Sequence, residues 1–267
     1  MPFPEKKRII YKQNPLDQVI CQLRFPPILK IETEIPANFQ DAIRHQFPKF
    51  IEKSEWKMNI PEAISEQVPP DFLQQMMPAA TGKNYEFSSD DDIWKINLTR
   101  NFVALTANEY RRWEAFKDKL AIPFEAIGRV YSPSYFSRVG LRYIDIIDRS
   151  RLGLKNTPWR ELFNPAISGI LGSDEIGDEV KSFESVYEIA LDGNYGNYSM
   201  VRIATKFVNN KETGETCYMI DSDFSNTSKI PIAEALNILN FFHLNASRLI
   251  QWSIKKPLHD AMQPEDL

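Results

Sequence analysis

Two short stretches, Cys21–Phe25 (CQLRF) and Val139–Tyr143 (VGLRY), decide the fold. Around each of them apolar side chains alternate with polar or small ones, and a period of two is typical of a half-buried β-strand. Both contain Leu-Arg followed by an aromatic residue, and Leu23 and Leu141 lie 118 positions apart. This likeness indicates that the chain repeats one structural unit.

The residues that follow the first stretch predict a strand, a helix, an irregular excursion, a hairpin and a second helix. Apolar residues at spacings of three or four define the helices, and the proline-broken segment between them fits neither period. The expected ranges are 15–31 for the strand region, 36–51 for the helix, 54–84 for the excursion, 85–110 for the hairpin and 109–130 for the last helix.

The second half predicts the same order of elements, with a three-stranded meander in place of the hairpin. The expected ranges are 137–147 for the strand, 157–172 for the helix, 186–191, 200–208 and 216–224 for the meander, and 230–254 for a long helix. Two further pairs of landmarks, Phe39 with Trp159 and Trp113 with Ile232, are 120 and 119 positions apart. We therefore expect an internal duplication with half-repeats at 1–132 and 133–267, merged into one globular unit.

These patterns predict an α+β protein. Strands joined in meanders favour a largely antiparallel sheet, and long amphipathic helices must cover one face of it. Two related halves would meet about a pseudo-twofold axis, which leaves the other face of the sheet wet or covered by a partner.

The composition fits a folded protein with no membrane association. Of 267 residues, 43% are hydrophobic, and the net charge of −4 argues against electrostatic binding of nucleic acid by the whole chain. No apolar run reaches the roughly 20 residues of a transmembrane helix, and residues 1–15 have no secretory-signal pattern. Cys21 and Cys217 lie in apolar runs and are expected to be free thiols. The sequence predicts a cytoplasmic location.

Several segments resemble a known group of proteins. Asn14–Val19, Gln22–Phe25, Pro36–Gln40 and Arg138–Tyr143, together with the closing helix, resemble a sporadically distributed prokaryotic family of about this length. The resemblance implies a bacterial or archaeal cytoplasmic protein, and it brings no established activity, cofactor or catalytic residue. Patchy distribution is typical of genes in defence or mobile-element cassettes, so the resemblance also implies an accessory role in such a system.

The chain lacks the motifs of the common catalytic and cofactor sites. It contains no phosphate-binding loop, no G-x-G-x-x-G and no G-x-S-x-G. Its histidines, His45, His243 and His259, do not have the spacing of a helical zinc site. We expect His243, on the long helix, to be a partly buried and hydrogen-bonded residue. The sequence therefore predicts no cofactor and disfavours an enzyme.

Paired arginines are the predicted binding feature. Arg24 and Arg142 occupy matching places in the two strands, each on the face opposite its Leu and aromatic neighbours, so both would face one groove. Arg138 and Tyr143 are the further candidate binding residues. Guanidinium groups bind carboxylates and phosphates through paired hydrogen bonds. The alternative is a structural role in ion pairs with neighbours in the sheet such as Glu188.

Asp221 and Asp223 form a D-x-D motif at the predicted end of a strand. Two carboxylates on one face of a strand can hold a hard cation such as Mg²⁺ together with phosphate oxygens. The alternative is that acidic residues precede the next helix, whose N-terminus favours negative charge.

Three functions remain open from the sequence. The first is a non-catalytic interaction or adaptor protein, because aromatic residues reach 12% and are common anchors at interfaces. The second is a sensor that binds an anionic small ligand or nucleotide between the two halves. The third is a metal-dependent phosphoester or nucleic-acid enzyme that uses Asp221 and Asp223. Another protein is the expected partner, an anionic ligand is the next, and nucleic acid is less favoured.

Overall fold

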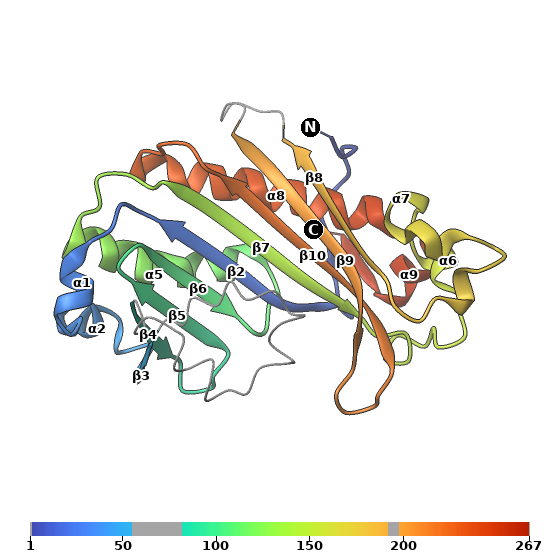
Figure 1. The fold of residues 1–267 in the computed structure, drawn as a ribbon, viewed down its shortest axis with the longest axis horizontal. Coiled ribbons are helices and arrows are strands. Elements are labelled where there is room, and N and C mark those ends of the chain that lie inside the picture. Colours follow the sequence, from blue (N-terminus) through green and yellow to red (C-terminus); the bar gives the residue numbers. More distant parts are fainter. Residues whose placement is uncertain (1, 55–81, 192–197, 267) are drawn as a thin grey trace, which may run out of the picture.

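The centre of the fold is an antiparallel pair of strands, β2 (Leu16–Arg24) and β7 (Arg138–Ile147). The computed structural model describes residues 2–54, 82–191 and 198–266. In it, nine strands form one sheet in the order β3-β4-β5-β6-β2-β7-β10-β9-β8, and all neighbouring strands run antiparallel (Figure 1). The structure confirms an α+β protein with an antiparallel sheet.

The strands on either side of this central pair come from opposite halves of the chain. Those beside β2 are β6 (Phe102–Ala107), β5 (Trp94–Thr99), β4 (Lys83–Ser88) and β3 (Lys49–Ser54). Those beside β7 are β10 (Thr216–Asn226), β9 (Ser199–Asn209) and β8 (Glu184–Ala190).

The β2–β7 register places Gln22 opposite Gly140 and Arg24 opposite Arg138. Because side chains alternate along a strand, each central strand divides its residues between the two faces of the sheet. Leu23 and Leu141 point to the buried face and are at most 1% exposed. Gln22 and Arg24 point to the opposite face, which we call the open face.

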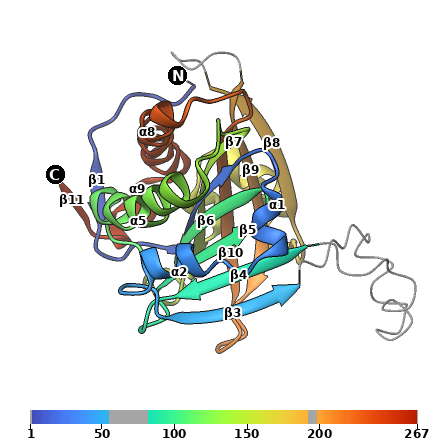
Figure 2. The same cartoon turned by 90° about the vertical axis from the view of Figure 1, so that its left-hand side faces the viewer.

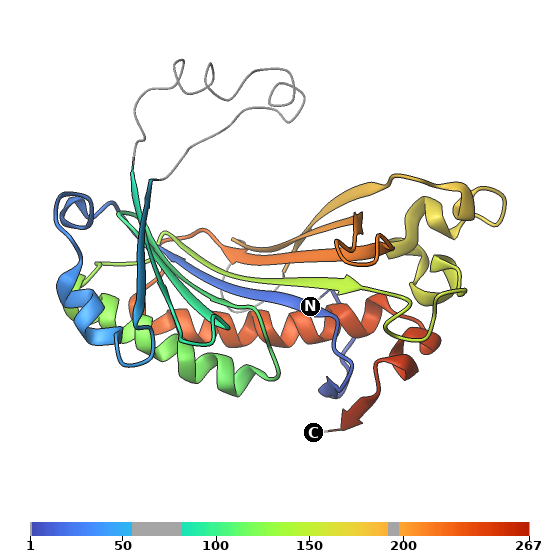
Figure 3. The ribbon, with the colours of Figure 1, turned by 90° about the horizontal axis from the view of Figure 1, so that it is seen from below.

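Two helices of 19 residues each, α5 (Trp113–Tyr131) and α8 (Ala235–Ser253), lie on the other face of the sheet (Figures 2 and 3). Each follows the strand next to the central pair, β6 before α5 and β10 before α8. The hydrophobic core fills the space between these helices and the sheet, and it includes Phe116 and Leu239. Among the described helices, none is long and apolar enough to cross a membrane.

The helix expected over residues 36–51 is wrong in its second half. The structure has α1 (Leu29–Thr33) and α2 (Ala37–Ile43), after which the chain turns and enters β3. Pro48 explains the difference, because proline lacks an amide hydrogen and disfavours the helical conformation of the residue before it. Phe47 is fully buried all the same, since the turn folds it into the core.

The helix expected over 157–172 is also wrong as one element. Short pieces replace it, namely α6 (Trp159–Leu162), α7 (Pro165–Ser168) and the 3-10 turns η1 (Gly169–Gly172) and η2 (Gly177–Glu179). Pro165 stops α6 from continuing, and the Asn164 side chain caps α7 by accepting a hydrogen bond from the Ile167 amide. The excursion expected over 54–84 lies mostly outside the described residues.

Two segments from far apart in the sequence close the helix side of the molecule. Strand β1 (Ile9–Tyr11) pairs with β11 (Pro264–Asp266), which follows the short helix α9 (Lys256–Ala261). Elsewhere in the chain, the 3-10 turn η3 (Ile232–Glu234) precedes α8. This two-stranded ribbon lies on the helix side of the sheet (Figure 2). We call residues 6–14, which contain β1, the N-terminal strap.

The packing of β7 predicts that substitutions on its two faces differ sharply in how much they lower the free energy of unfolding. Leu141→Ala removes a fully buried side chain at the centre of the sheet and should lower the free energy of unfolding by about 2–5 kcal/mol. Ile144→Ala, on the half-exposed open face of the same strand, should cost about 1 kcal/mol or less. Urea unfolding of both variants measures the difference, and equal losses would contradict the assignment of the faces.

Candidate functional site

Three arginines gather on the open face where β2 meets β7. Arg24, Arg138 and Arg142 line one groove of about 360 Å³. Its other lining residues are Ile20, Gln22, Gly140 and Asp223. The structure thus brings together the three arginines that the sequence singled out, and we call this feature the arginine groove.

Two of the three arginines are held by carboxylates of the adjacent strand β10. Arg142 donates to both oxygens of Asp221, with Nε–Oδ1 and Nη2–Oδ2 distances of 2.7 and 2.5 Å. Arg138 donates through Nη2 to both oxygens of Asp223, at 2.7 and 2.8 Å. The acidic partners are therefore these aspartates and not Glu188, which lies opposite Arg202 on β9.

Gly140 makes the second of these ion pairs possible. The Arg138 side chain lies across the backbone of residue 140, and a methyl group there would be 2.0 Å from Nη1 and 2.7 Å from Cζ of Arg138. Atoms cannot approach so closely, so any other residue would displace the guanidinium. The absence of a side chain at position 140 lets Arg138 reach Asp223.

Arg24 is the arginine of this groove that has no acidic partner among the described residues. In the register, Phe102 of β6 lies opposite Arg24, whereas Asp223 of β10 lies opposite Arg142. On its other side Arg24 faces Arg138, and like charges opposite each other in a sheet repel. Within the described part of the chain, Arg24 donates a hydrogen bond from Nε to the Gln22 side-chain oxygen at 3.1 Å.

Gln22 bridges the two facing arginines, because its side-chain oxygen also accepts from Arg138 Nη1 at 3.2 Å. The groove therefore holds three guanidinium groups against two carboxylates, Asp221 and Asp223, with Arg24 exposed to solvent. This excess of positive charge would be neutralised by an external anion, for which a guanidinium fork is well suited.

The D-x-D motif is not at the end of a strand. β10 continues to Asn226, so Asp221 and Asp223 lie inside the strand and do not lead into a helix. Their carboxylates are occupied by arginines, and a cation there would first have to displace a guanidinium group. In the described ranges, no group of three or more His, Cys, Asp or Glu residues is placed to hold a metal ion.

Tyr143 does not belong to the arginine groove. It follows Arg142 on β7 and so points to the opposite face, where it is 5% exposed beneath the helices. Its hydroxyl lies 3.1 Å from Nδ1 of His243 on α8. The expectation that Tyr143 binds a ligand together with the arginines is therefore wrong for this groove, because neighbouring residues in a strand point to opposite faces.

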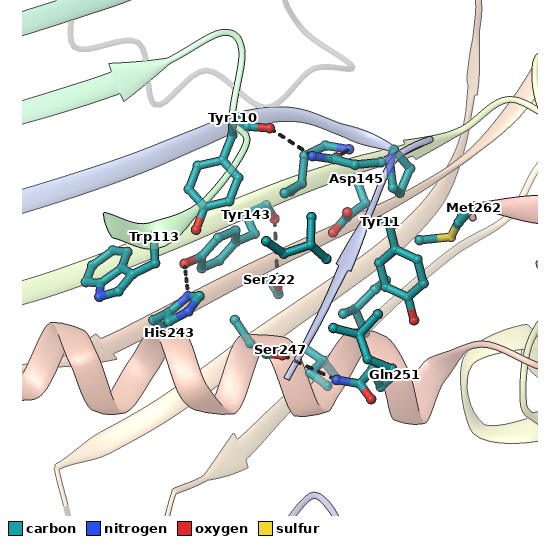
Figure 4. Close-up of a pocket in the computed structure, with 18 of the residues that line it drawn as sticks. Tyr11, Tyr110, Trp113, Tyr143, Asp145, Ser222, His243, Ser247, Gln251 and Met262 are labelled. Carbon is teal, nitrogen blue, oxygen red and sulfur yellow. Dashed lines mark hydrogen bonds between the residues drawn. The ribbon is translucent and has the colours of Figure 1, made fainter. Parts of the chain in front are cut away.

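Tyr143 instead lines a cavity of about 100 Å³ between the sheet, α8 and the N-terminal strap (Figure 4). Most of the wall is apolar or aromatic, with Trp113 and Tyr110 at one end and Tyr11 and Met262 at the other. A few polar groups converge on it, above all Asp145 of β7. Such a combination is typical of small-molecule sites, and we call it the internal cavity.

Asp145 is a buried carboxyl group without a charged partner. It is 6% exposed, and it makes no hydrogen bond or ion pair with any described residue. Burial away from water raises the pKa of Asp145 to about 7, because the apolar surroundings disfavour the charged form.

His243 and Tyr110 each direct an unsatisfied polar atom toward the same space. His243 stacks on Trp113 at 4.9 Å between ring centroids, and its Nε2 has no partner in the described structure. Burial lowers the pKa of His243 to about 4, and the nearby Arg8 acts in the same direction. The Tyr110 hydroxyl is likewise buried without a hydrogen-bond partner among the described residues. The expectation of a hydrogen-bonded histidine thus holds for Nδ1 alone.

Asp145 was missed by the sequence analysis, although the alternation of β7 contained a signal. Tyr143, Asp145 and Ile147 lie at every second position, so the aspartate must share the apolar face. A carboxyl group on that face calls for an explanation, because an unpaired buried charge is costly. What the strand pattern could not reveal is the strap that closes over it.

Comparisons with known proteins do not assign this chain to a family. No family model matches it, and no curated protein matches its sequence.

The close approach of Arg138 to Gly140 predicts that two glycine substitutions change the free energy of unfolding in opposite directions. Gly140→Ala should displace the Arg138 guanidinium and lower the free energy of unfolding by about 1 kcal/mol, the scale of a partly exposed ion pair. Gly128→Ala, in α5 with open space around it, should raise it by about 0.5–1 kcal/mol. Urea unfolding tests both. If Gly140→Ala costs as much in an Asp223→Asn background, then the glycine does not act through the ion pair.

The burial of Asp145 predicts that the wild type and the variant Asp145→Asn differ in stability by an amount that depends on pH. The unfolded chain ionises this carboxyl near its ordinary pKa of 3.8, whereas the folded protein does so near 7. Between these values the folded state binds an extra proton, so the wild type loses stability as the pH rises, by on the order of 4 kcal/mol in total. Asp145→Asn should therefore match the wild type near pH 4 and be more stable than it at pH 8.

Chemical unfolding at several pH values measures this difference. His243 also makes the stability of the protein depend on pH, because its lowered pKa destabilises the folded state as the pH falls. Both proteins contain His243, so subtracting the wild-type value from the variant value at each pH cancels this contribution. Asp17→Asn, which alters an exposed carboxyl of β2, is the matched control. A stability difference for Asp145→Asn that stays constant from pH 4 to pH 8 would contradict the assignment.

Proposed function

We propose that this protein is a non-catalytic interaction protein, whose open sheet face binds an acidic segment of a partner protein in the arginine groove. The observation that supports the proposal is the state of Arg24. Its guanidinium is exposed, lacks a carboxylate among the described residues and faces a second arginine across the strand pair. A carboxylate from a partner would supply the missing counter-charge.

The groove is preorganised for such binding. Asp221 and Asp223 fix Arg142 and Arg138, and Gln22 holds Arg24 through its Nε, which leaves the terminal nitrogens of Arg24 available. Fixing the side chains in advance reduces the entropy lost on association. A role for Arg142 in holding the fold follows from the same contacts, since Asp221 is 5% exposed and would be left unpaired without it.

An internal duplication would explain this groove. The residues at the 118-residue offset, Gln22 and Gly140, lie directly opposite each other in the β2–β7 pair, as a local twofold axis through that pair would require. The strand order outward from the pair also matches, with β6, β5 and β4 on one side and β10, β9 and β8 on the other. On this proposal Arg24 and Arg142 are equivalent, and they differ because Phe102 stands where the other half has Asp223.

Other parts of the interpretation stay predictions. They are the half-repeats at 1–132 and 133–267, the resemblance to a prokaryotic family, the cytoplasmic location and the accessory role in a defence or mobile-element cassette. The sensor for an anionic small ligand shares the same groove and the same chemistry. The metal-dependent enzyme has less support, because Asp221 and Asp223 are engaged by arginines.

Charge reversal at Arg24 tests the proposed function. The tagged protein is used to capture partners from its native lysate, with and without nuclease, and bound proteins are identified by mass spectrometry. Arg24→Glu should reduce capture of a stoichiometric protein partner at least tenfold, because it replaces attraction by repulsion toward acidic groups. Arg129→Glu, on the exposed side of α5, is the matched control and should capture as the wild type does.

The other outcomes separate the alternatives. A partner captured equally by Arg24→Glu and by the wild type would contradict the groove as the docking site. Loss of the captured material on nuclease treatment would indicate nucleic acid. With no protein captured, a melting temperature that rises with the concentration of an anionic nucleotide, and fails to rise in Arg24→Glu, would favour the sensor.

A further inference from the structure

We propose that the internal cavity is a binding site for a small organic amine, whose ammonium group pairs with the Asp145 carboxylate beneath the N-terminal strap. This site lies on the opposite face of the sheet from the arginine groove. It is independent of the proposed interaction function, because none of the residues that line the groove lines the cavity.

The carboxyl group defines the charge of the ligand. Asp145 is more than nine-tenths buried and has no basic or hydrogen-bonding partner among the described residues. Three arginines, Arg8, Arg111 and Arg112, line the same cavity. Arg8 forms a two-pronged ion pair with Glu114, with nitrogen–oxygen distances of 2.6 and 3.0 Å. Arg111 and Arg112 are exposed to solvent. A lone buried carboxylate is costly unless a cation joins it, so an ammonium group fits this position better than an anion does.

The surrounding rings support the same chemistry. Tyr11, Tyr110 and Tyr143 line the cavity together with Trp113 (Figure 4). Aromatic faces attract organic cations as well as their apolar bodies. The unpartnered Nε2 of His243 and hydroxyl of Tyr110 offer further hydrogen bonds to a nitrogen or to the remainder of the ligand.

The volume of the cavity suits a ligand of about five non-hydrogen atoms. An apolar cavity of roughly 150 Å³ accommodates benzene, and this one measures about 100 Å³. A short alkylamine such as n-butylamine is of the right size, whereas a nucleotide is far too large.

The strap that closes the cavity is attached at several points that could open together. The Lys6 ammonium donates a hydrogen bond to the Gln251 carbonyl of α8, and the Gln251 side chain donates one to the Lys7 carbonyl. The Tyr11 hydroxyl lies at hydrogen-bond distance, 2.9 Å, from Nδ1 of His259 on α9, and the Asn14 side chain donates to the Tyr110 carbonyl at 2.8 Å. These are polar contacts of partly buried groups at the rim. Release of the strap would open a path to Asp145 without unfolding the sheet.

Titration with n-butylammonium chloride tests the proposal. The full chain, labelled with ¹⁵N, is titrated at pH 8 and followed by backbone amide shifts, with n-butanol as the uncharged probe of similar size. We expect saturable binding with a Kd on the order of 1 mM or tighter. The shifts should cluster in β7 around Asp145 and in α8 around His243, and n-butanol should bind at least tenfold more weakly.

Two variants test separately the charge of the carboxylate and the volume of the cavity. Asp145→Asn should weaken n-butylammonium binding at least tenfold, because the amide keeps the shape and loses the charge. Ser247→Leu, which fills the cavity from α8 and leaves the carboxyl in place, should weaken it to a similar extent. Asp17→Asn on the exposed surface of β2 is the charge-matched control and should bind as the wild type does.

The opposite results would overturn the proposal. These are the absence of saturable binding up to roughly 50 times the expected Kd, equal binding of amine and alcohol, or binding unaffected by both cavity variants. If Asp145→Asn fails to fold, then Ser247→Leu together with the comparison of amine and alcohol still decides the question.

Discussion

The pairing of β2 with β7 is the interaction on which the rest of the structure depends. It joins strands from opposite halves of the chain, and its register fixes which residues face the helices. A shift by one residue would turn every side chain of one strand to the other face. If β2 were the strand that shifted, the Leu23 side chain would leave the core and Arg24 would enter it. The hydrophobic core therefore helps to specify the arginine groove, because it excludes registers that are shifted by one residue.

The same alternation gives one strand two separate chemistries. On β7, Arg138 and Arg142 lie in the groove, whereas Tyr143 and Asp145 lie in the internal cavity beneath α8. The groove lies on the open face and is positively charged, because among the described residues carboxylates pair with Arg138 and Arg142 but not with Arg24. The cavity lies beneath the strap and is mostly apolar, and its carboxyl group has no partner among the described residues. A sheet only one residue thick thus separates an anion-binding environment from one suited to a cation.

The strands and their faces could be predicted from the sequence, because alternation with period two is a local signal. It gave the apolar face of Leu23 and Leu141, the open-face position of the arginines and the class of fold. The ends of the helices were harder to predict, because Pro48 and Pro165 interrupt segments whose apolar spacing is otherwise that of a helix. The partners Asp221 and Asp223, the accommodation of Arg138 by Gly140 and the cavity over Asp145 depend on contacts between distant segments. Such contacts leave no trace in local periodicity.

The ribbon of β1 and β11 has a consequence for the order in which the molecule assembles during synthesis. Ile9 pairs with Asp266, so β1 leaves the ribosome long before its partner strand β11 has been synthesised. Contacts between residues so distant in sequence form late and slowly. The sheet and its two helices can pack before the ends meet, and the cavity over Asp145 stays uncovered through that interval. We therefore expect β1 and β11 to pair late in folding, and opening of the strap would reverse this pairing.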